Sequence, residues 1–172
     1  MKKLLIFFSV FLFASDVFFM PQDGKVAEKR VCYLLSHAKN NIKMTIYTFT
    51  NKKIAKALKI AAAHGVKITI IADKKEARYK YSVIPSLATI QNIHVYLLSG
   101  KSYKNGEKAK MHVKSTIIDN TYLITGSANY SYSAFYKNFE YLMISEDRFL
   151  IANFNSFFNH LRILSTDYRL AR

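Results

Sequence analysis

Cysteine is almost absent from this chain of 172 residues, and the single one, Cys32, excludes an intrachain disulfide. Cys32 lies in a predicted helix beside apolar residues, so we interpret it as a small core residue. Proline and glycine are also scarce, at 2 and 5 residues, and no repeats, low-complexity tracts or linkers occur. At this length the chain predicts one domain with a core of its own.

Acidic residues are the second shortage, with 11 Asp and Glu against 26 Lys and Arg, a difference of 26 − 11 = 15. Without Lys2 and Lys3 the surplus would be 13. So large a positive charge predicts a polyanionic partner, either nucleic acid or an anionic membrane surface. With one cysteine and few acids near the polar motif described below, we expect neither a zinc site nor a two-metal site, and no cofactor.

The N-terminus lacks a run long enough to span a bilayer. Lys2 and Lys3 precede an apolar stretch, residues 4–14, that is interrupted by Ser9 alone and is typical of a secretory leader. Cleavage after Ala14 or Ser15 would place a large residue at the −3 position. The alternative to a leader at residues 1–15 is therefore an uncleaved membrane anchor, which residues 17–20 would extend past Asp16. We therefore expect an exported protein, periplasmic or membrane-associated at the envelope, whose single domain spans residues 16–172.

Helix-like and strand-like segments alternate along the rest of the chain, which predicts an α/β sandwich: a mixed, mostly parallel sheet with helices on both faces. Gly65 and Asp147 mark a helix end and a helix start. The expected helices are 25–40, 51–64, 85–90, 131–138 and 147–164, and the expected strands are 43–49, 66–72, 94–98, 139–145 and two within 112–129. Residues 99–110 are predicted to be a Lys-rich loop.

The segment from residue 112 to residue 129 carries the strongest signal. It contains His-x-Lys-x4-Asp, at His112, Lys114 and Asp119, and then Gly-Ser-x-Asn, which includes Ser127 and Asn129. β-Branched residues between them predict two short strands joined by a turn at residues 119–121. Because side chains alternate along a strand, His112 and Lys114 share one face, as do Ser127 and Asn129. On adjacent strands the four polar groups would converge.

A nucleophile, a cation, a hydroxyl and an amide together suit a phosphate. A neutral imidazole can attack phosphorus, while Lys114 neutralises the oxygens and Ser127 and Asn129 donate to them. Asp119 is seven positions from His112 (119 − 112 = 7), which places it on the opposite face of a continued strand. We interpret it as a turn-stabilising residue. The alternative for the whole segment is a surface hairpin whose His and Lys are simply solvated.

These motifs resemble those of the phospholipase D superfamily, and in particular its small bacterial endonucleases with one motif per chain. Similarity extends to residues 19–24, which resemble the family's opening strand and turn, to residues 46–50, which resemble its second strand, and to its helix-to-strand junction at residues 63–68. It covers about residues 17 to 170, and residues 17–20 are expected to belong to the first strand of the sheet. The resemblance implies that His112 is the nucleophile, that Lys114 and Asn129 bind the scissile phosphate and that Ser127 supports the site. It also implies that Glu140, 28 positions after His112 (140 − 112 = 28), hydrogen-bonds the imidazole and fixes its reactive tautomer.

Only one motif occurs, since His37, the other histidine with a lysine two positions later, has Met44 where Asp is needed and no Gly-Ser-x-Asn after it. An in-line displacement also needs a general acid opposite the nucleophile. We therefore expect a homodimer that shares one active site, with one His112 as nucleophile and its copy as acid.

Two clusters interleave basic and aromatic residues, a composition that suits single-stranded nucleic acid. One comprises Lys74, Lys75 and Arg78 with nearby tyrosines, and solvated loops explain it equally well; the other leads directly into His112 and comprises Lys101, Tyr103, Lys104, Lys108 and Lys110. The sequence thus favours a metal-independent phosphodiesterase that cleaves nucleic acid through a phosphohistidine, with single-stranded DNA preferred and RNA open. The alternatives are a phospholipid head-group phosphodiesterase and a catalytically silent envelope DNA-binding protein.

Overall fold

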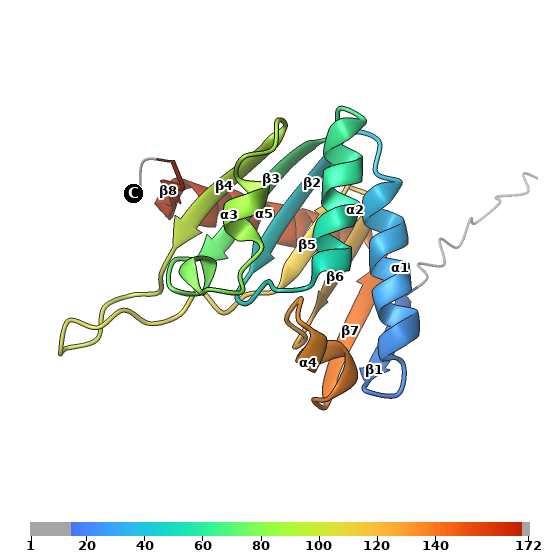
Figure 1. The fold of residues 1–172 in the computed structure, drawn as a ribbon, viewed down its shortest axis with the longest axis horizontal. Coiled ribbons are helices and arrows are strands. Elements are labelled where there is room, and N and C mark those ends of the chain that lie inside the picture. The colour runs from blue at the N-terminus through green and yellow to red at the C-terminus, as the bar shows by residue number, and fades with distance from the viewer. Residues whose placement is uncertain (1–14, 170–172) are drawn as a thin grey trace, which may run out of the picture.

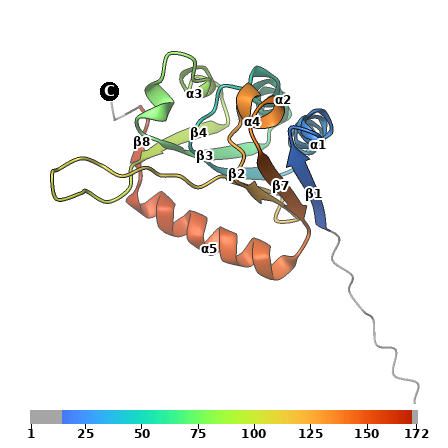
Figure 2. The same cartoon turned by 90° about the horizontal axis from the view of Figure 1, so that it is seen from below.

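The computed structural model describes residues 15–169, which form a three-layer α/β sandwich (Figures 1 and 2). An eight-stranded sheet has the order β1-β7-β6-β5-β2-β3-β4-β8. Four helices, α1 to α4, cover one face, and α5 lies alone on the other (Figure 2). The leader prediction falls on residues 1–14, outside the described residues, while Ser15 already begins β1.

The strands follow one another along the chain with the helices between them. The strands are β1 (Ser15–Met20), β2 (Asn41–Ile46), β3 (Lys67–Asp73), β4 (Ile93–Leu98), β5 (Ser115–Ile118), β6 (Tyr122–Gly126), β7 (Glu140–Ser145) and β8 (Thr166–Asp167). The helices are α1 (Gly24–Ser36), α2 (Lys52–Ala63), the 3₁₀ turn η1 (Glu76–Arg78), α3 (Ile84–Leu87), α4 (Tyr132–Tyr136) and α5 (Arg148–Leu164). Thus the helix-and-strand order is confirmed, except that η1 and β8 were not predicted.

Side-chain caps place the helix starts where the sequence indicated. Asn51 accepts from the backbone N–H of Lys53 and Ile54 at the start of α2, and Asp147 accepts from Phe149 and Leu150 at the start of α5. The α2 helix ends before Gly65, whose φ of +86° is readily adopted by glycine. The α1 helix ends at Ser36, four residues before the predicted end at residue 40.

The prediction of a mostly parallel sheet is wrong. Only the pairs β2–β3 and β3–β4 are parallel among the described strands, and the other five pairs are antiparallel. Parallel pairing needs a long crossover, which α2 and α3 with their flanking loops provide in the first half. In the second half a tight turn joins β5 to β6 and the short α4 connection leads to β7, so those strands run antiparallel.

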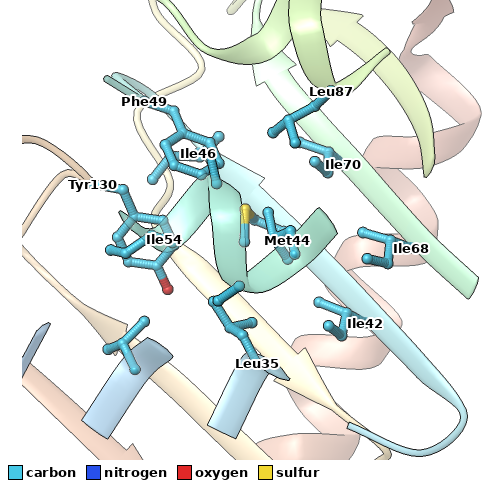
Figure 3. Packing of buried hydrophobic residues seen from close by; sticks show 14 of the residues in the cluster. Leu35, Ile42, Met44, Ile46, Phe49, Ile54, Ile68, Ile70, Leu87 and Tyr130 are labelled. Atoms are coloured by element: carbon cyan, nitrogen blue, oxygen red, sulfur yellow. The ribbon is translucent and has the colours of Figure 1, made fainter. Parts of the chain in front are cut away.

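The main core lies between the sheet and the α1–α2 layer. Leu35 of α1 and Ile54 of α2 pack over Met44 of β2 and Ile68 and Ile70 of β3 (Figure 3). Each of these side chains is essentially inaccessible to solvent. Burial of such side chains stabilises the fold by roughly 1.5–3 kcal/mol apiece. This rigid layer holds the carboxyl ends of β2 and β3 in fixed positions beside residue 112.

Cys32 is half-buried and packs against the rim of this core. It also borders an apolar groove between α1 and α2. Burial is the main cause that raises the pKa of its thiol. The interpretation of Cys32 as a small core residue is therefore confirmed in part, since one side of the thiol faces the groove.

Candidate active site

The strand pair predicted around the motif is present. β5 and β6 pair antiparallel with Ser115 opposite Thr125, and residues 119–121 form the turn between them. His112 and Lys114 lie just before β5, outside the regular strand. Buried cross-strand bonds fix the backbone here: Thr45 Oγ1 lies 2.7 Å from Ser115 Oγ, and Thr125 Oγ1 donates to the carbonyl of Lys114 at 3.0 Å.

His112 and Lys114 face each other at this edge. Lys114 Nζ donates to the carbonyl of His112 at 3.0 Å and lies 2.9 Å and 3.0 Å from the ring atoms Nδ1 and Nε2. Nearly equal distances to two atoms of one rigid ring place the ammonium over the ring face, away from either nitrogen lone pair. Neither nitrogen is thereby consumed as an acceptor. The imidazole is exposed, whereas the Lys114 side chain is buried, with 8% of it accessible.

The charges around this pair favour a neutral imidazole. Burial and the positive charges of Lys114 and Lys110 lower the pKa of His112, although Asp73 and Glu140 act in the opposite direction. Burial also lowers the pKa of Lys114, against the effect of Glu140. A lowered pKa keeps His112 unprotonated at neutral pH, which is the form that can act as a nucleophile.

An aromatic ring positions the imidazole from the β2 side. The ring of Tyr47, just after β2, lies with its centroid 4.6 Å from that of His112 at an interplanar angle of 56°. Lys110 and Lys114 place their ammonium groups 5.4 Å and 5.6 Å from the same tyrosine ring. Tyr47 therefore contributes apolar contact and cation–π attraction at the centre of a basic site. The sequence interpretation included Tyr47 only within a strand.

Ser127 and Glu140 form a second unit beside the first. Ser127 Oγ donates to Glu140 Oε2 at 2.5 Å and accepts from the backbone N–H of Tyr141 at 3.1 Å. Asn138 also donates to Glu140. Gly126 permits this arrangement, because its φ is +154° and a Cβ there would lie 2.3 Å from the carbonyl oxygen of Tyr141.

A direct hydrogen bond from Glu140 to His112, which the resemblance implied, does not occur in this structure. Among the described residues, the carboxylate of Glu140 bonds to Ser127 and Asn138. It acts on His112 and Lys114 through its charge, which raises the pKa of each.

Asn129 is held from the opposite side by β2. Its Oδ1 accepts from the backbone N–H of Thr48 at 3.2 Å, and Thr48 Oγ1 donates to Glu76 Oε2 at 2.9 Å. With the carbonyl oxygen engaged, the amide nitrogen of Asn129 keeps both its hydrogens for an acceptor.

Asp73 completes this network at the carboxyl end of β3. Its Oδ1 accepts from the backbone N–H of Lys75 and Glu76, and its Oδ2 accepts from Met111 N–H at 2.9 Å. Met111 precedes His112, so the buried Asp73 fixes the backbone that carries the imidazole. The sequence interpretation overlooked Asp73, although a single acid before Lys74 and Lys75, at the end of a strand, was a usable signal.

Asp119 lies at the other end of β5 and takes no part in the site. Its carboxylate accepts three backbone N–H bonds, from Lys39 at 2.7 Å, Asn40 at 2.7 Å and Asn41 at 2.9 Å. These contacts agree with the interpretation of Asp119 as a turn-stabilising or structural residue.

The two basic clusters differ in how they meet the site. Lys108 and Lys110, with Lys75 and Tyr47, line a cavity of about 430 Å³ that is also lined by three acids, Asp73, Glu76 and Glu107. Lys101, Tyr103 and Lys104 are exposed on the loop that projects beyond the sheet (Figure 1). Lys74 and Arg78 are exposed near η1. Thus Lys75 of the first cluster and Lys108 and Lys110 of the second line this cavity, whereas the other members of both clusters do not.

No three side chains of His, Cys, Asp or Glu within residues 15–169 gather in a way that could hold a metal ion. In the same range, none of the helices has both the length and the apolar character needed to cross a membrane.

Comparisons with known proteins agree with the geometry. Residues 31–162 match a family model described as "Cardiolipin synthase, PLD-like domain". The structure is similar to NucT from Helicobacter pylori, with a TM-score of 0.88 and 31% identity over 91% of this chain and 100% of that one. It also resembles Nuc, a phospholipase D family member from Salmonella typhimurium, with a TM-score of 0.75 and 24% identity over 91% and 99% of the two chains.

Curated relatives include longer proteins. The mitochondrial cardiolipin hydrolase of Xenopus tropicalis is 25% identical over 78% of this chain and 60% of its own length. A phospholipase D of Rickettsia prowazekii is 28% identical over 79% and 62%. The chain therefore spans about 60% of the length of the curated relatives it matches. From the matched family model, the motif and the fold, the chain belongs to the phospholipase D-like family.

Proposed function

We propose that this chain is a metal-independent phosphodiesterase that cleaves nucleic acid, with single-stranded DNA preferred, through a covalent phosphohistidine. The observation that carries the proposal is the pair His112 and Lys114. An exposed imidazole with a lowered pKa lies against a buried ammonium, and the amide nitrogen of Asn129 keeps its hydrogens for an acceptor. This arrangement supplies a nucleophile and a fixed positive charge without any further group.

The reaction follows from these positions. A nitrogen of His112 attacks phosphorus, the new P–N bond forms as the P–O bond to the leaving group breaks, and that oxygen takes a proton from a general acid. Water then attacks phosphorus and gives a proton to the group that acted as the acid, the P–N bond breaks and His112 is released. Lys114 and the Asn129 amide stabilise the charge on the non-bridging oxygens in both steps. Ser127 orients Glu140, whose negative charge keeps Lys114 protonated.

The general acid is, in this proposal, His112 of a second copy of the chain. One imidazole cannot be both the nucleophile and the acid on opposite sides of phosphorus. Exposed aromatic side chains flank Glu140 and support a contact between copies there: Phe139 is 89% accessible, Tyr141 48%, and Phe19, paired with Tyr141 across β1–β7, 60%. Such a patch at the rim of a site is typical of a protein interface.

Nucleic acid is favoured as the substrate by charge and by similarity. Lys108 and Lys110 line the cavity beside Tyr47, and Lys101, Tyr103 and Lys104 are exposed on the projecting loop. One of the solved structures that this chain resembles is NucT, a nuclease of this family, at 31% identity. A phospholipid with phosphodiester head groups is the second candidate, favoured by the similarity to cardiolipin hydrolases and phospholipases D. We also propose that the protein is exported and membrane-associated, because residues 4–14 form an apolar stretch.

The test is a cleavage assay in excess EDTA with single-stranded DNA, duplex DNA, single-stranded RNA and cardiolipin-containing vesicles. His112→Ala is compared with His160→Ala, an exposed histidine on α5. We expect cleavage of single-stranded DNA that survives EDTA, disappears in His112→Ala and persists in His160→Ala. Abolition by EDTA would contradict the mechanism, and turnover of vesicles alone would replace nucleic acid by phospholipid.

Two further readouts test the intermediate and the dimer. Mass spectrometry after a neutral quench should find the phosphoryl adduct on the peptide that contains His112. Sedimentation should give a dimer, and heterodimers of wild type with His112→Ala should be inactive, because each site would need both histidines. A fully active heterodimer would exclude a shared site.

A further inference from the structure

A second basic groove lies between α2 and the segment that leads into α3. Figure 2 shows α2 and α3 on the same face of the sheet. It has a volume of about 700 Å³ and contains four lysines and no acidic side chain: its lining is Thr50, Lys52, Ala55, Lys56, Lys59, Lys80, Tyr81, Ser82, Val83 and Ser86. Three of these lysines, Lys52, Lys56 and Lys59, lie on α2 and were not among the basic clusters identified in the sequence. A groove with positive charge alone fits a polyanion.

Helical spacing places the α2 lysines along this groove. Lys52, Lys56 and Lys59 are separated by four and three residues, so they lie on one face, about 6 Å and about 4.5 Å apart along the axis. Lys53 points elsewhere and forms an ion pair with Glu28 at 2.6 Å. On α2, therefore, Glu28 neutralises Lys53, whereas the other three lysines line the groove.

These lysines oppose the stability of their own helix. The first turn of α2 contains no acidic residue, and a positive charge at a helix N-terminus is unfavourable because it opposes the macrodipole. Lys52 and Lys56 also repel each other as like charges four residues apart. Phosphates bound along the groove would neutralise these lysines and remove both unfavourable interactions. Binding of phosphates therefore explains lysine at these positions better than helix stability does.

Tyr81 adds an aromatic surface at the same groove. Its side chain is 62% accessible, and Lys80 Nζ lies 4.7 Å from its ring centroid. Tyr79 packs against it edge-on, with centroids 5.4 Å apart. A ring held in place beside lysines is the arrangement on which an unpaired base stacks while the phosphates follow the cations.

The groove adjoins the catalytic edge through two chain segments. Tyr47 contacts His112 and Thr48 holds Asn129, and Thr50 of the same loop lines the groove. On the other side, Lys75 and Glu76 line the site cavity, and the chain continues to Lys80 in the groove. A strand leaving the site over this loop would enter the groove directly.

We propose that the groove binds the portion of a single-stranded nucleic acid that extends beyond the scissile phosphate. Lys52, Lys56, Lys59 and Lys80 hold successive phosphates, and Tyr81 stacks on a base. This inference rests on the proposed function, and it adds a specific path for the substrate and a dependence on its length. It assigns the groove to single strands because a duplex conceals its bases from Tyr81.

The experiment compares Lys52→Gln/Lys56→Gln/Lys59→Gln with Lys29→Gln/Lys39→Gln/Lys67→Gln, which removes three exposed lysines outside the groove and leaves the same net charge. Binding is measured by fluorescence anisotropy in a His112→Ala background, with an oligonucleotide of about 30 nucleotides, longer than common single-strand site sizes. We expect at least a tenfold weaker affinity for the groove variant, and a salt slope smaller by about 2 than that of the control, from three phosphates at about 0.7 each.

Turnover separates this inference from the proposed function. With His112 intact, both triple variants should hydrolyse bis(p-nitrophenyl) phosphate as wild type does, because so small a diester does not reach the groove. If wild type hydrolyses this diester but not DNA, the proposed function fails, and the binding assay still tests the groove. Equal binding by the two triple variants would overturn the groove proposal. So would a loss confined to anionic phospholipid vesicles, which would assign the lysines to a membrane surface.

Tyr81→Ala and Tyr81→Phe test the stacking contact. We expect Tyr81→Ala to weaken single-strand binding about tenfold and Tyr81→Phe to retain it, because the ring supplies the interaction. Equal losses for both variants, or none for either, would remove Tyr81 from the proposal.

Discussion

The two ends of β5 carry the two halves of one short motif, and they differ in what their polar groups contact. Before the strand, His112 and Lys114 lie against each other, and each has a lowered pKa. After the strand, Asp119 accepts three backbone N–H bonds and bonds the turn before β2. The first end retains groups that can engage a substrate, whereas the second end uses its carboxylate entirely within the fold.

A second acid makes the comparison sharper. Asp73 also accepts three backbone N–H bonds, from Lys75, Glu76 and Met111, but it does so at the catalytic end. Asp73 and Asp119 therefore have similar bonding and different neighbours. Position relative to His112, more than the number of hydrogen bonds, should decide which acid affects turnover.

The largest effect is expected at the catalytic end. His112→Ala should reduce phosphodiester turnover at least ~10³-fold, because the nucleophile is removed. His112 is exposed, so its loss should leave the free energy of unfolding nearly unchanged. Turnover and urea denaturation on the same preparations provide the measurement. Substantial residual turnover in a folded protein would mean that another group is the nucleophile.

The opposite pattern is expected at the structural end. Asp119→Ala should lower the free energy of unfolding by about 2–3 kcal/mol, since three backbone donors lose a charged acceptor. Turnover per folded molecule should stay within about twofold of wild type, because Asp119 touches nothing in the site. Urea denaturation and turnover at saturating substrate test both statements. A hundredfold loss of turnover with normal stability would contradict this division.

Asp73→Ala should combine the two patterns. The buried carboxylate holds three backbone donors, so we expect a loss of about 2–3 kcal/mol, similar to that of Asp119→Ala. Because Met111 leads into His112, kcat should also fall about tenfold, with little change in KM. The control is Asp119→Ala, matched in hydrogen bonds. Equal kcat values for the two variants would mean that Asp73 does not position the imidazole.

The smallest effect is a shift in the pH profile. Turnover needs a neutral nucleophilic His112, whose pKa is lowered from 6.5 by partial desolvation of the ring and by the charges of Lys114 and Lys110, so the acid limb should lie below pH 6.5. Glu140→Gln removes a negative charge that raises the pKa of His112 and of Lys114. Both pKa values should fall further, and the acid limb should move to lower pH. Glu146→Gln, an exposed acid at the end of β7, is the control. A shift to higher pH would contradict the sign.

Local signals in the sequence predicted most individual elements. Asn51 and Asp147 start helices because their side chains cap backbone donors within three residues. The turn at residues 119–121 depends on two residues with φ of +52°, Asp119 and Asn120, both of types that tolerate this conformation. Strand pairing was less predictable. The mixed sheet depends on connection lengths and on which edges meet, and these are properties of the assembled layers.

The sequence by itself determined the chemistry of this protein: a His, a Lys, a Ser and an Asn at spacings that two short strands bring together, in a strongly basic chain. Tertiary structure decided how those groups are held. Asp73, Thr48 and Tyr47 lie 39, 64 and 65 positions before His112 (112 − 73, 112 − 48, 112 − 47), and no local pattern links them to it. Parallel pairing of β2 and β3 and antiparallel pairing of β2 with β5 place all of them at one edge. The same packing places Glu140 within hydrogen-bonding distance of Ser127.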